Sequence, residues 1–96
     1  MAFWAYILRC ADGSYYTGHT DNLELRLGRH ARGDHASYTA SRLPVVLSYA
    51  AQTSTRDEAL AMELRIKGWS RKKKEAMMRG DWATVNRLAR GPDRGR

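Results

Sequence analysis

FWAYILRCADGSYYTGH, residues 3–19, is the stretch that decides the fold of this chain. Residues 3–10 are apolar and aromatic, residues 11–13 (ADG) are a turn signal, and residues 14–19 are rich in tyrosine and threonine. Two short strand-like runs joined by a glycine-containing turn predict a β-hairpin.

The length of the hairpin loop decides where two tyrosines point. A two-residue loop of Asp12 and Gly13 would place Tyr6 and Tyr16 on opposite faces of the sheet. A three-residue loop, closed by Gly13 in the left-handed conformation, would place both phenols on one face. In that second register Tyr6 lies opposite Gly18, and the absent side chain would leave a dent that a phosphate could fill. Gly18 is therefore a candidate phosphate contact.

A helix is expected directly after the hairpin. Asp21 and Glu24 form a capping-box-like start, and Gly33 marks the end. Arg26 and His30 are four positions apart and are therefore neighbours on this helix, where it meets the sheet. The expected buried stripe consists of Leu23, Leu27 and Ala31.

The middle of the chain predicts a long loop and a third strand. Residues 33–43 have no clear period and read as a loop that offers phosphate contacts from Ser37, Tyr38, Thr39 and Arg42. Residues 44–51 predict a strand, with residues 45–47 (VVL) as its apolar centre.

A second capping box, Thr55 with Glu58, predicts a helix whose apolar stripe is Ala59, Met62, Ile66 and Trp69. Glu63 lies at the edge of this stripe, where a carboxylate is partly desolvated. Ser70 predicts a short helix to about residue 78, and Asp81 a last helix carrying Trp82, Val85 and Leu88. We expect the three tryptophans, Trp4, Trp69 and Trp82, to be core residues.

Composition narrows the class of protein. The 96 residues, 43% of them apolar, suffice for one modest core, and the net charge of +7 favours a nucleic-acid partner. The single cysteine, Cys10, falls in an apolar run and predicts a buried thiol in a reducing cytoplasm. We expect no signal peptide, no membrane span and, from the histidine spacing, no zinc module.

Five side chains could form a phosphodiester-cleaving site. Tyr6 or Tyr16 would act as general base once a nearby cation or histidine lowers the pKa of the phenol. Arg26 would bind phosphate oxygens in a bidentate fork, His30 would assist, and Glu63 would hold a divalent metal. Each has a plainer explanation: sheet packing for the tyrosines, an exposed helix arginine, a histidine at a helix end, and an ion pair of the glutamate with Lys67.

The run Arg71, Lys72, Lys73 and Lys74 opens a helix, where positive charge opposes the helix dipole. A docked phosphate backbone would relieve that conflict, and a solvated basic turn is the alternative. The candidate nucleic-acid contacts are Gly18, Arg42, Lys67, Arg71, Lys72 and Lys73.

These motifs together resemble the GIY-YIG nuclease superfamily. The resemblance is carried by Tyr6, by Tyr16 with Thr17 and Gly18, and then by Arg26, His30 and Glu63. The runs YILRCADGS, EAL and ELRIKG, which begin at residues 6, 58 and 63, are especially similar to the small stand-alone bacterial members. The similarity extends from residue 3 to about residue 78.

The resemblance implies an α+β fold, a three-stranded antiparallel sheet flanked by helices. It also implies hydrolysis of a nucleic-acid phosphodiester with one Mg²⁺ or Mn²⁺. By position, Tyr6 and Tyr16 match the two motif tyrosines, Arg26 the phosphate-binding arginine, His30 the helix histidine, and Glu63 the metal ligand. The base role falls to the pair of tyrosines.

We therefore expect residues 1–80 to form a nuclease domain, residues 81–90 a C-terminal helix packed on it, and residues 91–96 a mobile basic tail. The expected function is a cytoplasmic endonuclease of low sequence specificity, acting on DNA in repair or processing. One alternative is a catalytically weak or inactive nucleic-acid-binding module of the same fold, and another is a structural accessory of an RNA–protein assembly.

Overall fold

The computed structural model describes residues 2–90 and has an α+β fold, as predicted. A three-stranded antiparallel sheet in the order β2-β1-β3 is formed by β1 (Phe3–Arg9), β2 (Tyr15–Thr20) and β3 (Val46–Thr53). β2 and β3 are therefore both edge strands. The basic tail expected at residues 91–96 lies outside the described residues.

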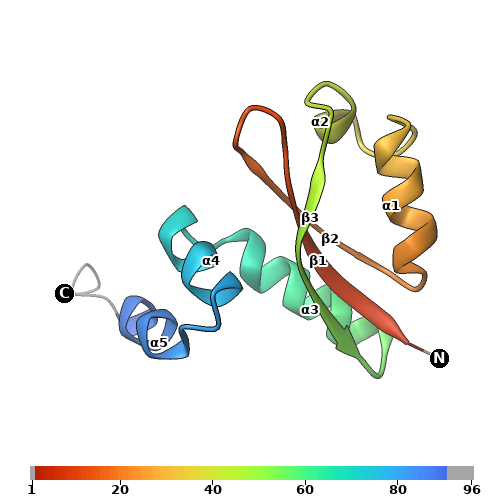
Figure 1. Cartoon of the computed structure of the whole chain (residues 1–96). Coiled ribbons are helices and arrows are strands. Elements are labelled where there is room, and N and C mark those ends of the chain that lie inside the picture. Colours follow the sequence, from red (N-terminus) through yellow and green to blue (C-terminus); the bar gives the residue numbers. More distant parts are fainter. Residues whose placement is uncertain (1, 91–96) are drawn as a thin grey trace.

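Helices cover both faces of the sheet, with α1 and α2 on one side and α3 and α4 on the other (Figure 1). In the described part of the chain none of the helices is long and apolar enough to cross a membrane. The helices are α1 (Leu23–Ala31), α2 (Ser37–Ala40), α3 (Arg56–Lys67), α4 (Arg71–Met78) and α5 (Trp82–Arg90).

The hairpin has the three-residue loop, so the second of the two registers is confirmed. Tyr6 pairs with Gly18, and both tyrosines lie on one face of the sheet. The backbone amide of Gly13 donates to the carbonyl of Cys10 at 2.9 Å, and Gly13 has a φ of 85°. Glycine adopts that left-handed conformation without steric penalty, which is why the loop closes there.

Helix α1 begins one residue later than predicted. Asn22, not Asp21, is the N-cap, and its side chain accepts a hydrogen bond from the backbone amide of Leu25. Asp21 instead pairs with Arg56 at 3.0 Å. The predicted stripe is also wrong at Ala31, which is exposed.

The segment predicted as an irregular loop contains α2, and the third strand is shifted toward the C-terminus. The apolar centre expected at residues 45–47 lies at the entry to β3, where Val46 is 63% and Leu47 40% exposed. Val46 and Leu47 pair with Arg9 and Leu8 of β1 on one side only, because β3 is an edge strand.

Helices α3, α4 and α5 begin at the predicted caps. Thr55 and Glu58 form a reciprocal capping box, and Ser70 caps α4 by accepting from the amide of Lys73. Asp81 accepts from the amide of Thr84 at 3.1 Å at the start of α5. These three starts were predicted from side chains that satisfy the free amides of a first turn.

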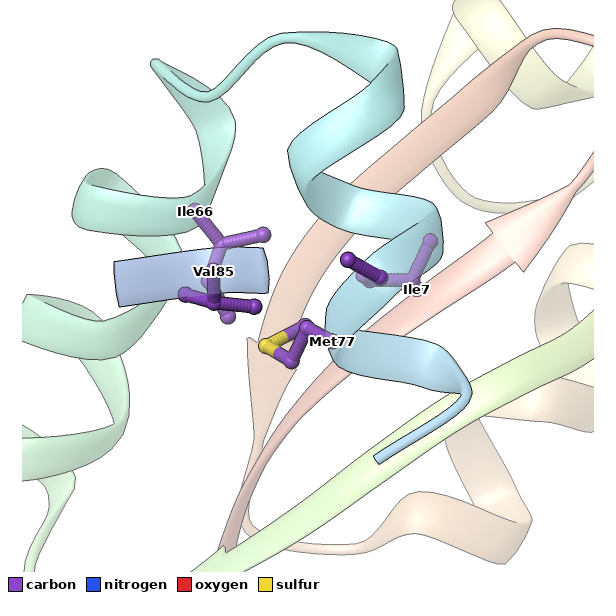
Figure 2. Packing of buried hydrophobic residues seen from close by; sticks show 5 residues of the cluster. Ile7, Ile66, Met77 and Val85 are labelled. Atoms are coloured by element: carbon purple, nitrogen blue, oxygen red, sulfur yellow. The ribbon is translucent and has the colours of Figure 1, made fainter. Parts of the chain in front are cut away.

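The core lies between the sheet and helices α3, α4 and α5. Trp82 is 49% exposed, so the prediction that it is a core residue is wrong, whereas Trp69 packs against the cluster. Figure 2 shows the close packing of the buried cluster, which consists of Ile7, Ile66, Ala76, Met77 and Val85. Because strand residues alternate between faces, burial of Ile7 on this side turns Tyr6 toward α1.

Candidate active site

A buried chain of hydrogen bonds links β1, α1 and α2. The hydroxyl oxygen of Tyr6 lies 2.8 Å from Nε2 of His30, and Nδ1 of His30 lies 2.9 Å from Oγ1 of Thr39. All three side chains are fully buried. His30 points inward because it sits on the face of α1 that covers the sheet.

The direction of these bonds follows from Thr39. Its hydroxyl has one proton, which points to the carbonyl oxygens of His35 at 3.0 Å and Ala36 at 3.2 Å. Thr39 must therefore accept from Nδ1–H of His30, which leaves Nε2 to accept the proton of Tyr6. Burial, with help from His35 and Arg26, lowers the pKa of His30 to about 4, so the ring is neutral at pH 7.

Tyr16 lies beside this chain but is not part of it. The centroid of its ring is 5.3 Å from that of His30, edge to face. Its hydroxyl forms no hydrogen bond within residues 2–90, and the side chain is half-buried. Burial raises the pKa of Tyr16, and the Glu63 carboxylate raises it further. A free phenol at the surface of the site is open to a ligand.

Both phenols are protonated at neutral pH in this state. Burial raises the pKa of Tyr6 to about 12, although the Arg26 guanidinium opposes that shift. Either tyrosine therefore needs an acceptor or an added cation to act as a base. Nε2 of His30 is such an acceptor for Tyr6.

Arg26 is held at the site by two fixed acceptors. Nη1 donates to the carbonyl oxygen of His19 at 3.2 Å and to Nε2 of His35 at 3.1 Å. The guanidinium also interacts with the Tyr6 hydroxyl, which it reaches closely enough to lower the pKa of that phenol against the effect of burial. The guanidinium is thus oriented and still has donors for a phosphate.

Glu63 is the carboxylate of the site. It is 8% exposed, and its two oxygens lie 2.5 Å from Nδ1 of His19 and 2.8 Å from Nζ of Lys67. Burial alone would raise the pKa of Glu63, but the hydrogen bonds from Lys67 and His19 outweigh it and lower the pKa. Glu63 is therefore ionised at neutral pH.

The edge position of β2 brings Glu63 to the tyrosines. Helix α3 packs on β2 from the side opposite α1 (Figure 1), and the Glu63 carboxylate bonds to His19 of β2. Glu63 contributes to the raised pKa of both Tyr6 and Tyr16, as expected of a negative charge close to two phenols. The sheet edge is thus where all five predicted residues approach one another.

The chemistry of these donors fits magnesium better than a protein-enclosed metal. Within residues 2–90 no group of three or more His, Cys, Asp or Glu side chains could hold an ion. One buried, ionised carboxylate suits Mg²⁺, which keeps several waters and completes its shell with substrate phosphate. Glu63 is the residue that would hold it.

Gly18 has a different role from the one expected. A Cβ atom at Gly18 would lie 2.7 Å from the hydroxyl oxygen of Tyr6, so the dent beside Tyr6 is filled by the phenol itself. Gly18 therefore admits the Tyr6 ring, and the space is not open to a phosphate.

Arg42 and Lys67, two of the predicted phosphate contacts, form ion pairs with acidic side chains of the chain. Arg42 pairs with Asp12 at 3.0 Å and lies 3.8 Å from the centroid of the Tyr38 ring. Lys67 donates to Glu63, which is the ion pair that its spacing also suggested.

The basic residues at the start of α4 differ in what they contact. Arg71 donates to the carbonyl of Gly13 at 2.7 Å, and Nζ of Lys73 lies 4.2 Å from the centroid of the Trp69 ring. Lys72 is exposed and makes no hydrogen bond or ion pair within residues 2–90.

Sequence reasoning missed the residues that hold the site together. The sequence predicts no role for His19 or His35, yet His19 contacts Glu63 and His35 contacts Arg26. Thr39 was read as a phosphate contact, yet it is buried and fixes the tautomer of His30. The alternation of β2, which turns His19 toward α3, was the one available signal.

A sequence model of the GIY-YIG catalytic domain matches residues 2–76. The chain belongs to the GIY-YIG family. The resemblance found in the sequence is thereby confirmed, and all five carried-over positions lie within the match. GIY-YIG domains are generally nucleases that use divalent metals, which implies a nucleic-acid substrate.

The relatives of this GIY-YIG protein are small proteins. It is 49% identical over 70 residues to a UPF0213 protein of Bacillus pumilus, covering 73% of this chain and 71% of that protein. It is 43% identical over 72 residues to a UPF0213 protein of Halobacterium salinarum, covering 75% and 94%.

Solved structures agree with the fold. The solution NMR structure of the UPF0213 protein BH0048 from Bacillus halodurans has a TM-score of 0.52 and 40% identity, over 80% of this chain and 82% of that one. That of the protein EF2693 from E. faecalis has a TM-score of 0.58 and 37% identity, over 83% and 85%.

Proposed function

We propose that this GIY-YIG protein is a divalent-metal-dependent endonuclease that hydrolyses DNA phosphodiester bonds with low sequence specificity. The observation that carries the proposal is the buried bond from Tyr6 to a neutral His30, beside Tyr16, Arg26 and the ionised Glu63. We assign the enzyme to DNA repair or processing in the cytoplasm.

Arg26 and Glu63 would act on the phosphate. The free donors of Arg26 would bind nonbridging oxygens and stabilise the charge that develops in the transition state. Glu63 would hold Mg²⁺ or Mn²⁺, and the bound ion supplies Lewis-acid stabilisation of that charge.

Tyr6 and Tyr16 would share the activation of water. The proton of Tyr6 already points at Nε2 of His30, so a path exists for it to leave as the phenol takes a proton from water. Tyr16, whose hydroxyl forms no hydrogen bond within residues 2–90, would contact the water or the scissile phosphate directly. His30 is a positioning and proton-accepting partner of Tyr6.

Low specificity follows from the kind of contacts that the chain offers. The 17 Lys and Arg residues against 10 Asp and Glu favour binding to the phosphate backbone, which carries no direct sequence information.

A nicking assay on supercoiled plasmid and on single-stranded DNA, with magnesium or with EDTA, tests the proposal. We expect cleavage only with metal, and a loss of roughly 100-fold or more in Glu63→Ala and Arg26→Ala. Arg65→Ala is the control, because Arg65 is exposed on α3 and makes no hydrogen bond or ion pair within residues 2–90. Equal cleavage by Glu63→Ala, Arg26→Ala and wild type would contradict the assignment.

A nucleic-acid-binding module with little catalysis is the second candidate. One observation favours this candidate: the two carboxylate oxygens of Glu63 already bond to His19 and Lys67, so neither is free to bind a metal. This candidate predicts steeply salt-dependent binding without metal-dependent cleavage.

A further inference from the structure

A pocket of about 300 Å³ opens beside the candidate active site. Strand β2 forms one side of the pocket. Tyr38 of α2, Lys67 of α3 and Lys74 of α4 complete its wall. Tyr16 belongs both to this pocket and to the active site, and Lys67 is bonded to Glu63. We call it the lysine pocket; its lining residues are Tyr15, Tyr16, Thr17, Tyr38, Lys67 and Lys74.

The charge of the lysine pocket is positive. Lys67 and Lys74 line it, and because Lys67 is paired with Glu63 at 2.8 Å, Lys74 supplies the uncompensated charge. Lys74 is half-buried and makes no ion pair or hydrogen bond within residues 2–90. Burial lowers the pKa of Lys74, and the charge of Lys67 lowers it further. Two cations held near each other are stabilised by an anion placed between them.

Thr17 is an independent sign of a ligand. It is 3% exposed, and its Oγ1 is the one buried side-chain polar atom without a hydrogen-bond partner in the described part of the chain. A buried hydroxyl without a partner is costly, and such groups call for an explanation. Thr17 belongs to the wall of the lysine pocket, so an oxygen bound there is the candidate acceptor for its hydroxyl.

We propose that the lysine pocket binds a phosphate group of the substrate strand next to the one that is cleaved. Lys74 and Lys67 are the cations, and Thr17 is an additional donor. The proposal rests on the function proposed above, because the shared Tyr16 and Lys67 place the second phosphate beside the reaction centre. Tyr15, Tyr16 and Tyr38 form the aromatic walls of the pocket around these cations.

Binding of a short single-stranded oligonucleotide in EDTA tests this without cleavage. Lys74→Gln should bind about tenfold more weakly than wild type. It should also reduce the slope of log affinity against log salt by about one. Arg65→Gln removes the same charge from α3, at a position that does not line the lysine pocket. It should change the affinity and the salt slope less than Lys74→Gln does. Equal behaviour of Lys74→Gln and Arg65→Gln overturns the proposal.

Neutral methylphosphonate groups, placed at one position of the oligonucleotide at a time, locate the phosphate. One position should weaken wild-type binding about tenfold and cost Lys74→Gln nothing further. Penalties that add at every position overturn the proposal. If the occupant is instead a terminal phosphate, only an oligonucleotide with a 5′-phosphate will depend on Lys74, and the assignment to an internal phosphate is overturned.

Thr17→Val separates binding from folding. Because Oγ1 of Thr17 has no hydrogen-bond partner among residues 2–90, the nearly isosteric variant should keep or raise the melting temperature while weakening oligonucleotide binding. Unchanged binding in a folded Thr17→Val removes Thr17 from the site. Failure of Glu63→Ala to lose cleavage would leave these binding results intact, so the two proposals fail separately.

Discussion

The hydroxyl of Tyr6 donates to Nε2 of His30 across 2.8 Å in a fully buried pair. The direction of the bond is imposed by Thr39, which must accept from the other ring nitrogen. A neutral histidine held in one tautomer is therefore the immediate acceptor for a phenol proton.

Removing the hydroxyl of Tyr6 and removing that of Tyr16 should have different effects on stability. Tyr6→Phe leaves Nε2 of His30 buried and unpaired, so the free energy of unfolding should fall by about 1–3 kcal/mol. Tyr16→Phe removes a hydroxyl that has no partner within residues 2–90 and should leave stability nearly unchanged. Urea denaturation measures both, and a larger loss of stability in Tyr16→Phe would contradict this account.

The same two variants should both lose cleavage. General acid–base catalysis contributes about 100-fold or more, so single-turnover rates should fall by that order in Tyr6→Phe and Tyr16→Phe. Wild-type rates in both variants would remove the phenols from the mechanism.

His30 predicts an acid-sensitive fold. Its pKa is about 4 in the folded chain, against 6.5 for an unperturbed imidazole. Between these values the unfolded chain binds more protons, so the free energy of unfolding should fall as the pH is lowered from 6.5 toward 4. The slope contributed by this residue is at most about 1.4 kcal/mol per pH unit.

Denaturation between pH 6.5 and 5.5 isolates this effect, because unperturbed Asp and Glu side chains have pKa values of about 3.9 and 4.3. His30→Gln should have a shallower slope of stability against pH than wild type, with the remainder coming from His35, whose pKa is also lowered by burial. Equal slopes would show that His30 does not titrate as the buried geometry requires.

Much of the fold could be predicted from the sequence because single residues fix the local backbone geometry. Gly13 has no Cβ and closes a three-residue loop without strain, so the register of Tyr6 and Tyr16 was one of two stated options. Thr55 and Ser70 cap their helices as predicted. Such signals act over a few residues and do not depend on tertiary packing.

The wrong predictions concern features that depend on tertiary packing. Asp21 and Asn22 are both good caps, and the pairing of Asp21 with Arg56, distant in sequence, leaves the cap to Asn22. Val46 looked like the centre of a strand, but its strand lies at the sheet edge. Lys74 was the one member of its basic run not chosen as a contact, yet it alone of that run lines the lysine pocket.

Gly18 should not tolerate a side chain. In Gly18→Ala the new Cβ would meet the Tyr6 hydroxyl at 2.7 Å, and the ring is buried and unable to move freely. Overpacking of this kind costs about 1–3 kcal/mol. Gly28→Ala is the matched control, because its nearest contact is the flexible end of Arg32 at 3.5 Å and alanine favours the helix. Thermal denaturation should show opposite shifts; a stable Gly18→Ala would contradict the packing of Tyr6.

Lys67 should compete with the metal for Glu63. Its Nζ donates to the carboxylate at 2.8 Å, so Lys67→Met frees one oxygen and removes a repelling cation. Calorimetric titration with Mn²⁺ in the absence of nucleic acid should show affinity raised up to about tenfold. Arg65→Gln should bind Mn²⁺ as wild type does, and weaker binding in Lys67→Met would show that the lysine supports the metal site.

The single-turnover rate of oligonucleotide cleavage against magnesium concentration, in wild type and in Glu63→Gln, tests the central claim most directly. The account predicts a saturable dependence on magnesium in wild type. In Glu63→Gln, which keeps the shape of the side chain, the rate should be lower by roughly 100-fold or more. Cleavage that persists in EDTA, or that is as fast in Glu63→Gln, would contradict it.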